Sequence, residues 1–289
     1  MARCGEADTQ SMHIRGSLPL CLLLSLFASQ ADAQFRAPEA PAPGENFHVE
    51  LALMFWKPTP GIVIGSDSLR AVNATGVDLV QQFGIEDKRF NEFRSVLQGG
   101  KSKVRISHVD MIYNEASTLQ QAVVIGGRPF NIAADATADL DWELWKVGYE
   151  HDFAKTGRGF FGFIADMHFN HVVANLSATS QGFTAGSVTD KKVPFPALGV
   201  IGRVYPHKNI GVTAEWSGFK MPGFIANKLA DTGDGTAHLK NFDVSVTGSI
   251  TRYFGVQGGY RALTADYLLD SDSGDLEMKG YYFGGMVRF

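Results

Sequence analysis

Asp166 and His168 stand two positions apart in a segment of alternating polarity, and Glu215 lies in a later segment of the same kind. A carboxylate beside an imidazole can position a water molecule for hydrolysis by general base catalysis. These three side chains are therefore the candidate catalytic group, provided that the two segments meet in space. The alternative, which we favour, is that they belong to a structural network of polar side chains.

A second group of chemically capable residues forms a short acidic run, with Asp270, Asp272 and Asp275. Carboxylate oxygens at close spacing can hold Ca²⁺. The run lacks the twelve-residue spacing and the closing glutamate of an EF-hand, so we favour a solvated turn. The chain contains no phosphate-binding loop, dinucleotide fingerprint or HExxH motif. We expect neither a cofactor nor a metal centre.

The first 33 residues have the layout of a secretory signal peptide. An apolar run from Leu18 to Ala28 precedes Ala31-Asp32-Ala33, which fits a small-x-small cleavage site. The run is shorter than the roughly 20 residues that a transmembrane helix needs. Residues 34–45 are rich in Pro and Ala and are predicted to be a linker, so the folded domain is expected over residues 46–289.

Composition excludes several classes of protein. The net charge is −4, and no basic block marks a surface for nucleic acid. Apolar residues make up 45% of the chain, which is enough to build a core and argues against disorder. Both cysteines, Cys4 and Cys21, precede the predicted cleavage site, so the mature chain has no thiol for a disulfide or a zinc site.

From residue 46 onward apolar and polar residues alternate with a period of two, which is typical of β-strands. One example is the alternation of Trp145, Val147 and Tyr149 with Lys146, Gly148 and Glu150. The pattern predicts ten strands, at residues 46–57, 91–98, 102–125, 128–153, 158–177, 194–206, 209–221, 240–253, 255–269 and 277–289. Eight strands are the alternative, because the pattern at 91–98 is weak.

Short turns alternate with long connections along the chain, which is the layout of a transmembrane barrel. The long connections are expected at residues 58–90, 178–193, 222–239 and 270–276. Residues 77–90 could form a short helix in the first of them. The third and fourth strands are predicted to meet directly at a turn near Gly126-Gly127.

Alternation alone does not separate a membrane barrel from a soluble one, whose apolar face turns inward. Two features favour the membrane. The apolar face is rich in aromatic residues near the strand ends, as interfacial girdles require. The polar face carries charges of both signs that could pair in a lumen: Glu50, Arg94, Lys146, Glu150, Asp166, Arg203, Glu215, Asp243 and Arg261.

The last residues add a resemblance. Tyr281, Phe283, Val287 and Phe289 alternate up to a final aromatic residue. This segment resembles the C-terminal β-signal of bacterial outer-membrane proteins, which implies recognition by the barrel-assembly machinery. The region 46–289 resembles the class of small outer-membrane barrels that includes the OmpA transmembrane domain, OmpX and the omptins. Omptins act through Asp and His pairs, but no omptin segment matches this chain residue by residue.

These observations predict an all-β protein, a closed antiparallel up-and-down barrel in the bacterial outer membrane. We expect a monomer with a filled polar lumen, in contact with outer-membrane lipid and lipopolysaccharide, and a structural or surface-binding role through the long loops. One alternative is an outer-leaflet hydrolase that uses Asp166 and His168. The other is a narrow channel for small solutes, although ten strands enclose far less space than the 16–18 strands of porins.

Overall fold

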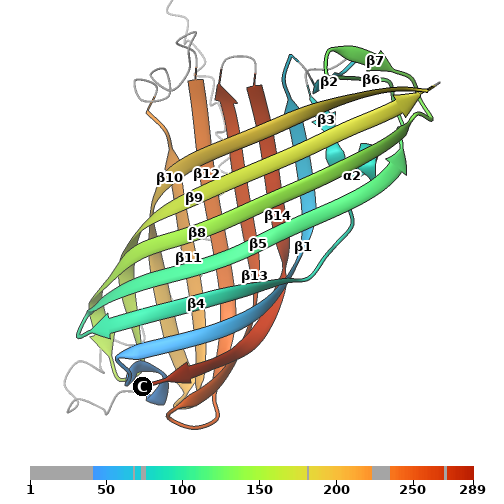
Figure 1. Ribbon diagram of the computed structural model, residues 1–289. Helices are drawn as coiled ribbons and strands as arrows, with labels where there is room; N and C mark the ends of the chain where they lie inside the picture. The colour runs from blue at the N-terminus through green and yellow to red at the C-terminus, as the bar shows by residue number, and fades with distance from the viewer. Residues whose placement is uncertain (1–41, 68, 73–75, 181, 223–234, 270–271) are drawn as a thin grey trace, which may run out of the picture. The chain divides into compact units, whose positions relative to one another are not determined.

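The computed structural model describes residues 42–289 except 68, 73–75, 181, 223–234 and 270–271. Ten strands form an antiparallel ring within this part of the chain (Figure 1). In ring order they are β1 (Val49–Gly65), β4 (Phe90–Gly99), β5 (Ser102–Thr118), β8 (Asp135–Thr156), β9 (Gly159–Ser180), β10 (Phe183–His207), β11 (Ile210–Lys220), β12 (Gly235–Ser249), β13 (Phe254–Leu269) and β14 (Asp272–Arg288).

The pairing of β1 with β14 closes the ring, and we call this pairing the seam. Its register runs from Glu50 opposite Arg288 to Gly65 opposite Ser273. Beyond Arg288, the Phe289 amide donates to the Val49 carbonyl at 2.8 Å. Each strand of the ring thus pairs with a neighbour on both of its sides, which closure in a lipid environment requires. The closed antiparallel barrel of ten strands is confirmed, and the eight-strand alternative is wrong.

Three neighbouring strands are the longest in the described ring. β8 and β9 have 22 residues each and β10 has 25, whereas about 9–11 residues span a bilayer as a tilted strand. The long connection predicted at 178–193 is wrong, because β9 and β10 continue through it as a paired hairpin. The residues of this segment are mostly small and polar, so the alternation of apolar and polar residues is lost although the strands remain paired. The hydroxyl groups of Thr179 and Thr184, for example, form a hydrogen bond of 2.8 Å across the pair.

The direct turn predicted between the third and fourth strands is also wrong. β5 ends at Thr118 and β8 begins at Asp135. The residues between them include a separate hairpin, whose turn at Gly126 and Gly127 has φ of 58° and 74°, as a two-residue hairpin turn requires. This hairpin joins a strand of the first long connection in a small sheet of β2 (Leu69–Ala71), β6 (Val123–Ile125) and β7 (Arg128–Phe130).

The helix expected within residues 77–90 is present but short. β3 (Val77–Asp78) leads into α2 (Leu79–Phe83), where the Asp78 carboxylate caps the helix by accepting from the Gln81 amide at 3.1 Å. Gly84 ends it in the left-handed conformation, with φ of 69°. Leu79 and Phe83 are fully buried against the barrel core. Before β1 a single 3-10 turn, η2 (Pro43–Glu45), completes the described elements.

The wall of the barrel has the polarity of a transmembrane protein. Large apolar side chains alternate outward and are exposed, for example Trp216 at 55% and Phe283 at 61%. Inward neighbours such as Glu215 and Tyr282 are buried. A soluble barrel would turn these faces the other way, whereas transmembrane barrels have an apolar exterior. In the part of the chain that the structure describes, no helix is long and apolar enough to cross a membrane.

Candidate functional site in the barrel lumen

The half of the lumen nearest the C-terminus is filled by charged side chains. Glu45 of η2 enters this end of the barrel, where its carboxylate lies 3.0 Å from Arg203 Nη1 and accepts from the Tyr205 hydroxyl at 2.8 Å. The second oxygen of Glu45 is 3.9 Å from Lys103 Nζ and 3.5 Å from Lys155 Nζ. The last residue of the predicted linker therefore bridges β5, β8 and β10.

From Lys103 a chain of alternating charges crosses the lumen. Lys103 Nζ contacts Glu150 at 2.6 Å, and Glu150 lies 3.4 Å from Arg105. Arg105 also pairs with Glu215, which accepts from Lys146 Nζ at 3.1 Å. Each carboxylate thus lies between two cations contributed by other strands. We call this series, from Arg203 to Lys146, the ion-pair chain.

A second group of charges lies between β4, β12, β13 and β14. Glu92 binds Arg94 at 2.8 Å and Arg261 at 2.9 Å. Arg261 also contacts Asp243 at 3.1 Å, and Asp243 accepts from the Tyr282 hydroxyl at 2.7 Å. The Arg94 guanidinium lies over the Tyr282 ring, 4.4 Å from its centroid. Tyr282 therefore contacts this group through both its hydroxyl and the face of its ring.

The interior charges balance. Within the described barrel, the inward residues that form ion pairs are eight acids, Glu45, Glu50, Glu92, Glu150, Asp152, Asp166, Glu215 and Asp243, and eight bases, Arg94, Lys103, Arg105, Lys146, Lys155, Arg203, Arg261 and Arg288. A cavity of about 90 Å³ remains among them. Because a buried charge is costly unless it is paired, this balance stabilises a filled lumen.

The other half of the lumen is apolar. Trp56, Met111, Trp142 and Met278 are at most 1% exposed and belong to one cluster with α2 and the small sheet. The Trp142 indole donates to the Asn170 side-chain oxygen at 3.0 Å. Its only buried polar edge is thus satisfied, as a buried indole requires. Charges fill one half of the barrel and packed hydrocarbon fills the other.

The structure brings the candidate catalytic residues close together through a lysine. Asp166 lies 3.6 Å from Lys146 Nζ, and Glu215 lies 3.1 Å from the same atom. A Cβ at Gly148 would collide with the Asp166 carboxylate, so this glycine makes room for it. Asp166, His168 and Glu215 are all buried, at 4%, 2% and 6% exposure. The lumen cavity touches Lys146 and Glu215, and neither Asp166 nor His168 lines it.

His168 lies at the boundary between the charged and apolar halves. Its backbone neighbours across the sheet are Lys146 on β8 and Phe195 on β10. Neither ring nitrogen has a hydrogen-bond partner among the described residues. A general base needs a hydrogen bond to the group that it activates, and the buried imidazole has no such neighbour here.

The remaining predicted site residues lie elsewhere on the barrel. Asp270 is outside the described residues. Asp272 and Asp275 are three positions apart on β14, so the alternation of a strand directs them to opposite faces, and Asp275 is exposed. The residues of the proposed assembly signal alternate outward: Tyr281, Phe283 and Phe289 are exposed and Val287 is half-buried.

Sequence reasoning missed Glu45 because it was assigned to a linker. Glu92, Lys103 and Arg105 were also missed, although their inward parity follows from the alternation of 90–99 and 102–118. The alternation of the strands could have identified them, because each residue directly precedes or follows an outward apolar residue such as Phe93 or Val104. Glu45 carried no such signal, because it lies before the first strand.

Comparison with known proteins gives only distant likenesses. No protein-family model matches the chain, and no curated protein matches it in sequence. Solved structures with a similar fold include the outer membrane protease OmpT from Escherichia coli, with TM-score 0.49 and 8% identity over 83% of this chain and 96% of that one. The Pseudomonas putida toluene transporter TodX has TM-score 0.37 and 8% identity over 86% and 93%. Neisserial surface protein A has TM-score 0.33 and 9% identity over 84% and 97%.

The structures in this comparison are outer-membrane β-barrels. At such identities and TM-scores the likeness carries no argument about activity.

Proposed function

We propose that this chain is a monomeric bacterial outer-membrane barrel with a closed lumen, and that it acts at the cell surface through its outer wall and its long loops. The polarity of the wall supports the membrane location, because exposed aromatic side chains would otherwise face water. Lipid and lipopolysaccharide are then the immediate neighbours of this surface.

The main support for a closed lumen is that both of its halves are filled, one by the ion-pair chain and the other by packed apolar side chains. A conducting path would have to separate the ion-pair chain, whose side chains are at most 16% exposed, and then cross the layer around Trp56 and Trp142. Opposite charges in a low-dielectric space attract strongly. The apolar layer offers water no hydrogen-bond partners, so it opposes hydrated ions by a different mechanism.

The hydrolase alternative has less support. Asp166 and Glu215 share Lys146, and ion pairing of this kind suits a structural network. His168 has no carboxylate within hydrogen-bond distance among the described residues and lies away from the cavity. The channel alternative requires an open path that the filled lumen opposes.

Planar-bilayer recording of the purified barrel tests the proposal. We expect no stable single-channel steps from the wild-type protein. The Arg203→Ala variant removes a member of the ion-pair chain, and Lys279→Ala, on the outward face, is the matched control. Stable steps in the wild-type protein that change in Arg203→Ala but not in Lys279→Ala would overturn the closed lumen and favour a channel.

The membrane location has its own test. Fractionation of cells that express the full chain should recover the folded barrel in the outer-membrane fraction. Recovery of folded, water-soluble protein would contradict the proposal even if no conductance were seen.

A further inference from the structure

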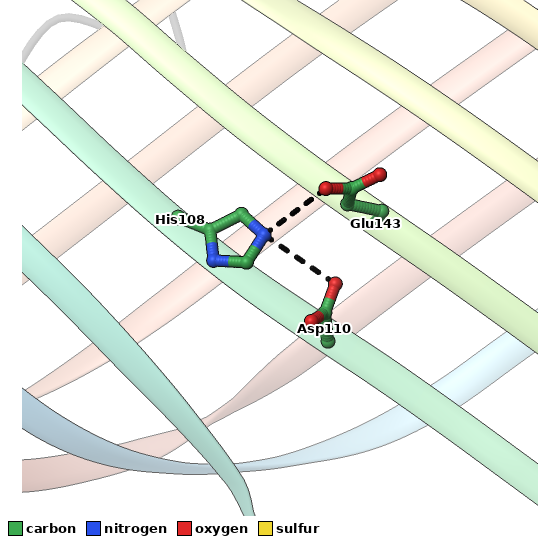
Figure 2. Close-up of side chains that lie close together, drawn as sticks. All are labelled: His108, Asp110 and Glu143. Carbon is green, nitrogen blue, oxygen red and sulfur yellow. Dashed lines mark hydrogen bonds and ion pairs between the residues drawn. The ribbon is translucent and has the colours of Figure 1, made fainter.

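A second group of polar residues lies on the outer wall, away from the lumen. His108 and Asp110 alternate outward on β5, and Asp110 is the cross-strand partner of Glu143 on β8. His108 Nε2 lies 3.4 Å from Asp110 Oδ1 and 3.3 Å from Glu143 Oε1. Figure 2 shows both carboxylates directed at this one ring nitrogen.

Hydrogen bonding alone does not account for this convergence. The Nε2 atom has at most one hydrogen to donate, so it satisfies one of the two carboxylates. One oxygen from each carboxylate and the ring nitrogen lie within 4.8 Å of one another. In a tetrahedral zinc site with bonds of about 2.0–2.1 Å, the edges between ligand atoms are about 3.3 Å long. The two distances from His108 have this length.

From this geometry we propose that His108, Asp110 and Glu143 bind a divalent transition metal ion of the zinc type on the outer wall. Imidazole together with carboxylate suits zinc and its neighbours in the first transition series, whereas Ca²⁺ and Mg²⁺ take oxygen ligands. Three protein ligands leave a coordination position for water or for an external oxygen ligand. No metal centre was expected from the sequence, so this site departs from that expectation.

Trp145 holds two of the ligands in place. Its ring lies against the His108 ring, with centroids 4.2 Å apart and an interplanar angle of 34°. Its indole nitrogen donates to Glu143 Oε1 at 2.8 Å. Outer contacts of this kind orient ligands and influence metal affinity. One residue therefore fixes both the plane of the imidazole and the position of the carboxylate.

The surrounding charge also favours a cation. His171 on β9 lies 3.8 Å from Glu143 Oε2 and 3.0 Å from Asp190 Oδ1 on β10. Three carboxylates thus share two imidazoles. Among the described residues, neither Lys nor Arg forms an ion pair with Asp110, Glu143 or Asp190. A bound divalent ion would supply the missing positive charge.

The three ligand side chains are not covered by the described residues of the chain. The exposed side-chain fractions are 26% for His108, 52% for Asp110 and 39% for Glu143. The site does not depend on the lumen being open or closed. Failure of the closed-lumen proposal would therefore leave this inference standing, and the reverse also holds.

Titration of the untagged, detergent-folded protein with Co²⁺ and Zn²⁺ tests the site. We expect visible Co²⁺ absorption bands that saturate at one equivalent and are displaced by Zn²⁺. His108→Ala and the isosteric Asp110→Asn should each weaken binding at least about tenfold. The control is His238→Ala, because His238 faces the single carboxylate of Asp266 at 2.8 Å. It should bind Co²⁺ as the wild-type protein does.

Circular dichroism and heat-modifiable gel mobility should show that each variant is folded before it is titrated. The proposal fails if folded His108→Ala and Asp110→Asn bind Co²⁺ as tightly as the wild type. It also fails if His238→Ala loses binding to the same degree, or if the wild-type protein gives no Co²⁺ bands at millimolar metal. Equal affinity for Mg²⁺ or Ca²⁺ would overturn the zinc-type assignment.

Discussion

Arg288 of the last strand lies opposite Glu50 of the first strand, and its Nε donates to Glu50 Oε2 at 2.5 Å across the seam. The guanidinium is 2% exposed and also donates to the Ser249 hydroxyl at 3.2 Å. On either side of Arg288, Val287 and Phe289 belong to the predicted assembly signal. The final segment thus presents an outward apolar face and an inward ionic contact that joins the two ends of the ring.

Arg288→Met should destabilise the barrel. It leaves the Glu50 carboxylate, whose side chain is 14% exposed, without its partner. Breaking a fully buried ion pair in this way costs about 3–5 kcal/mol, which is the upper bound here. Urea unfolding in lipid vesicles measures the change. The control Lys279→Met removes an exposed cation that pairs with Glu277 on the outward face and should unfold as the wild type does. The exchange Glu50→Arg with Arg288→Glu should recover part of the loss, and no loss in Arg288→Met would show that the seam closes without this pair.

Val147→Arg should impair folding into lipid. Val147 faces outward at 41% exposure, between two inward residues, Lys146 and Gly148. Arginine on the lipid face costs about 2–4 kcal/mol at the midplane and much less near the interface. Val188→Arg is the depth control, because Val188 lies on the long extension of β10 and is 73% exposed. Folding yields in vesicles compare the two, and equal yields would contradict the placement of Val147 on the lipid-facing wall within the bilayer.

Most of the ring was predictable because a strand's side chains alternate with a period of exactly two residues. That period placed Glu50, Arg94 and Glu215 inside and Val147 and Trp216 outside before any pairing was known. It could not show where a strand ends once its outward residues become polar. The extension of β9 and β10 and the true end of β5 were therefore missed.

The partners of each charge could not be predicted, because they depend on the stagger between strands. Arg105 and Glu215 are far apart in sequence and meet only across the lumen. His108 and Glu143 meet because β5 pairs with β8 in one register, and the chain between them includes the β6–β7 hairpin. A slip of one residue would turn one of these side chains to the other face.

Glu45 should make the stability of the barrel depend on pH. It precedes β1, outside the spanning strands. Burial raises the pKa of its carboxyl group, but the charges of Arg203, Lys103 and Lys155 and the Tyr205 hydroxyl lower it by more, so the pKa is below its ordinary value of 4.5. A carboxyl group with a lowered pKa in the folded state stabilises the protein above the unfolded pKa. That contribution is lost as the pH falls below about 4.5 toward the folded value.

Glu45→Gln should therefore lose stability at neutral pH and show a weaker decline on acidification than the wild type. Urea midpoints measured at several values between neutral pH and the acid limit of the folded protein give the comparison. Tyr205→Phe removes one donor and keeps the three cations, so it should reduce the decline only in part. Parallel pH profiles for Glu45→Gln and the wild type would show that Glu45 does not bridge the strands in solution.

His168→Leu should stabilise the barrel, by contrast. A buried polar group without a hydrogen bond costs about 1–3 kcal/mol, and leucine at this position would face the buried Phe195 of the neighbouring strand. The matched control is Asn170→Leu, two positions along on the same inward face. Asn170 accepts from the Trp142 indole at 3.0 Å, so its loss leaves a buried donor unsatisfied and should destabilise the protein. Opposite signs in the two variants would support a purely structural lumen. If His168→Leu is instead destabilised as strongly as Asn170→Leu, the imidazole has a partner in solution, and the hydrolase hypothesis gains the hydrogen-bonded group that it requires.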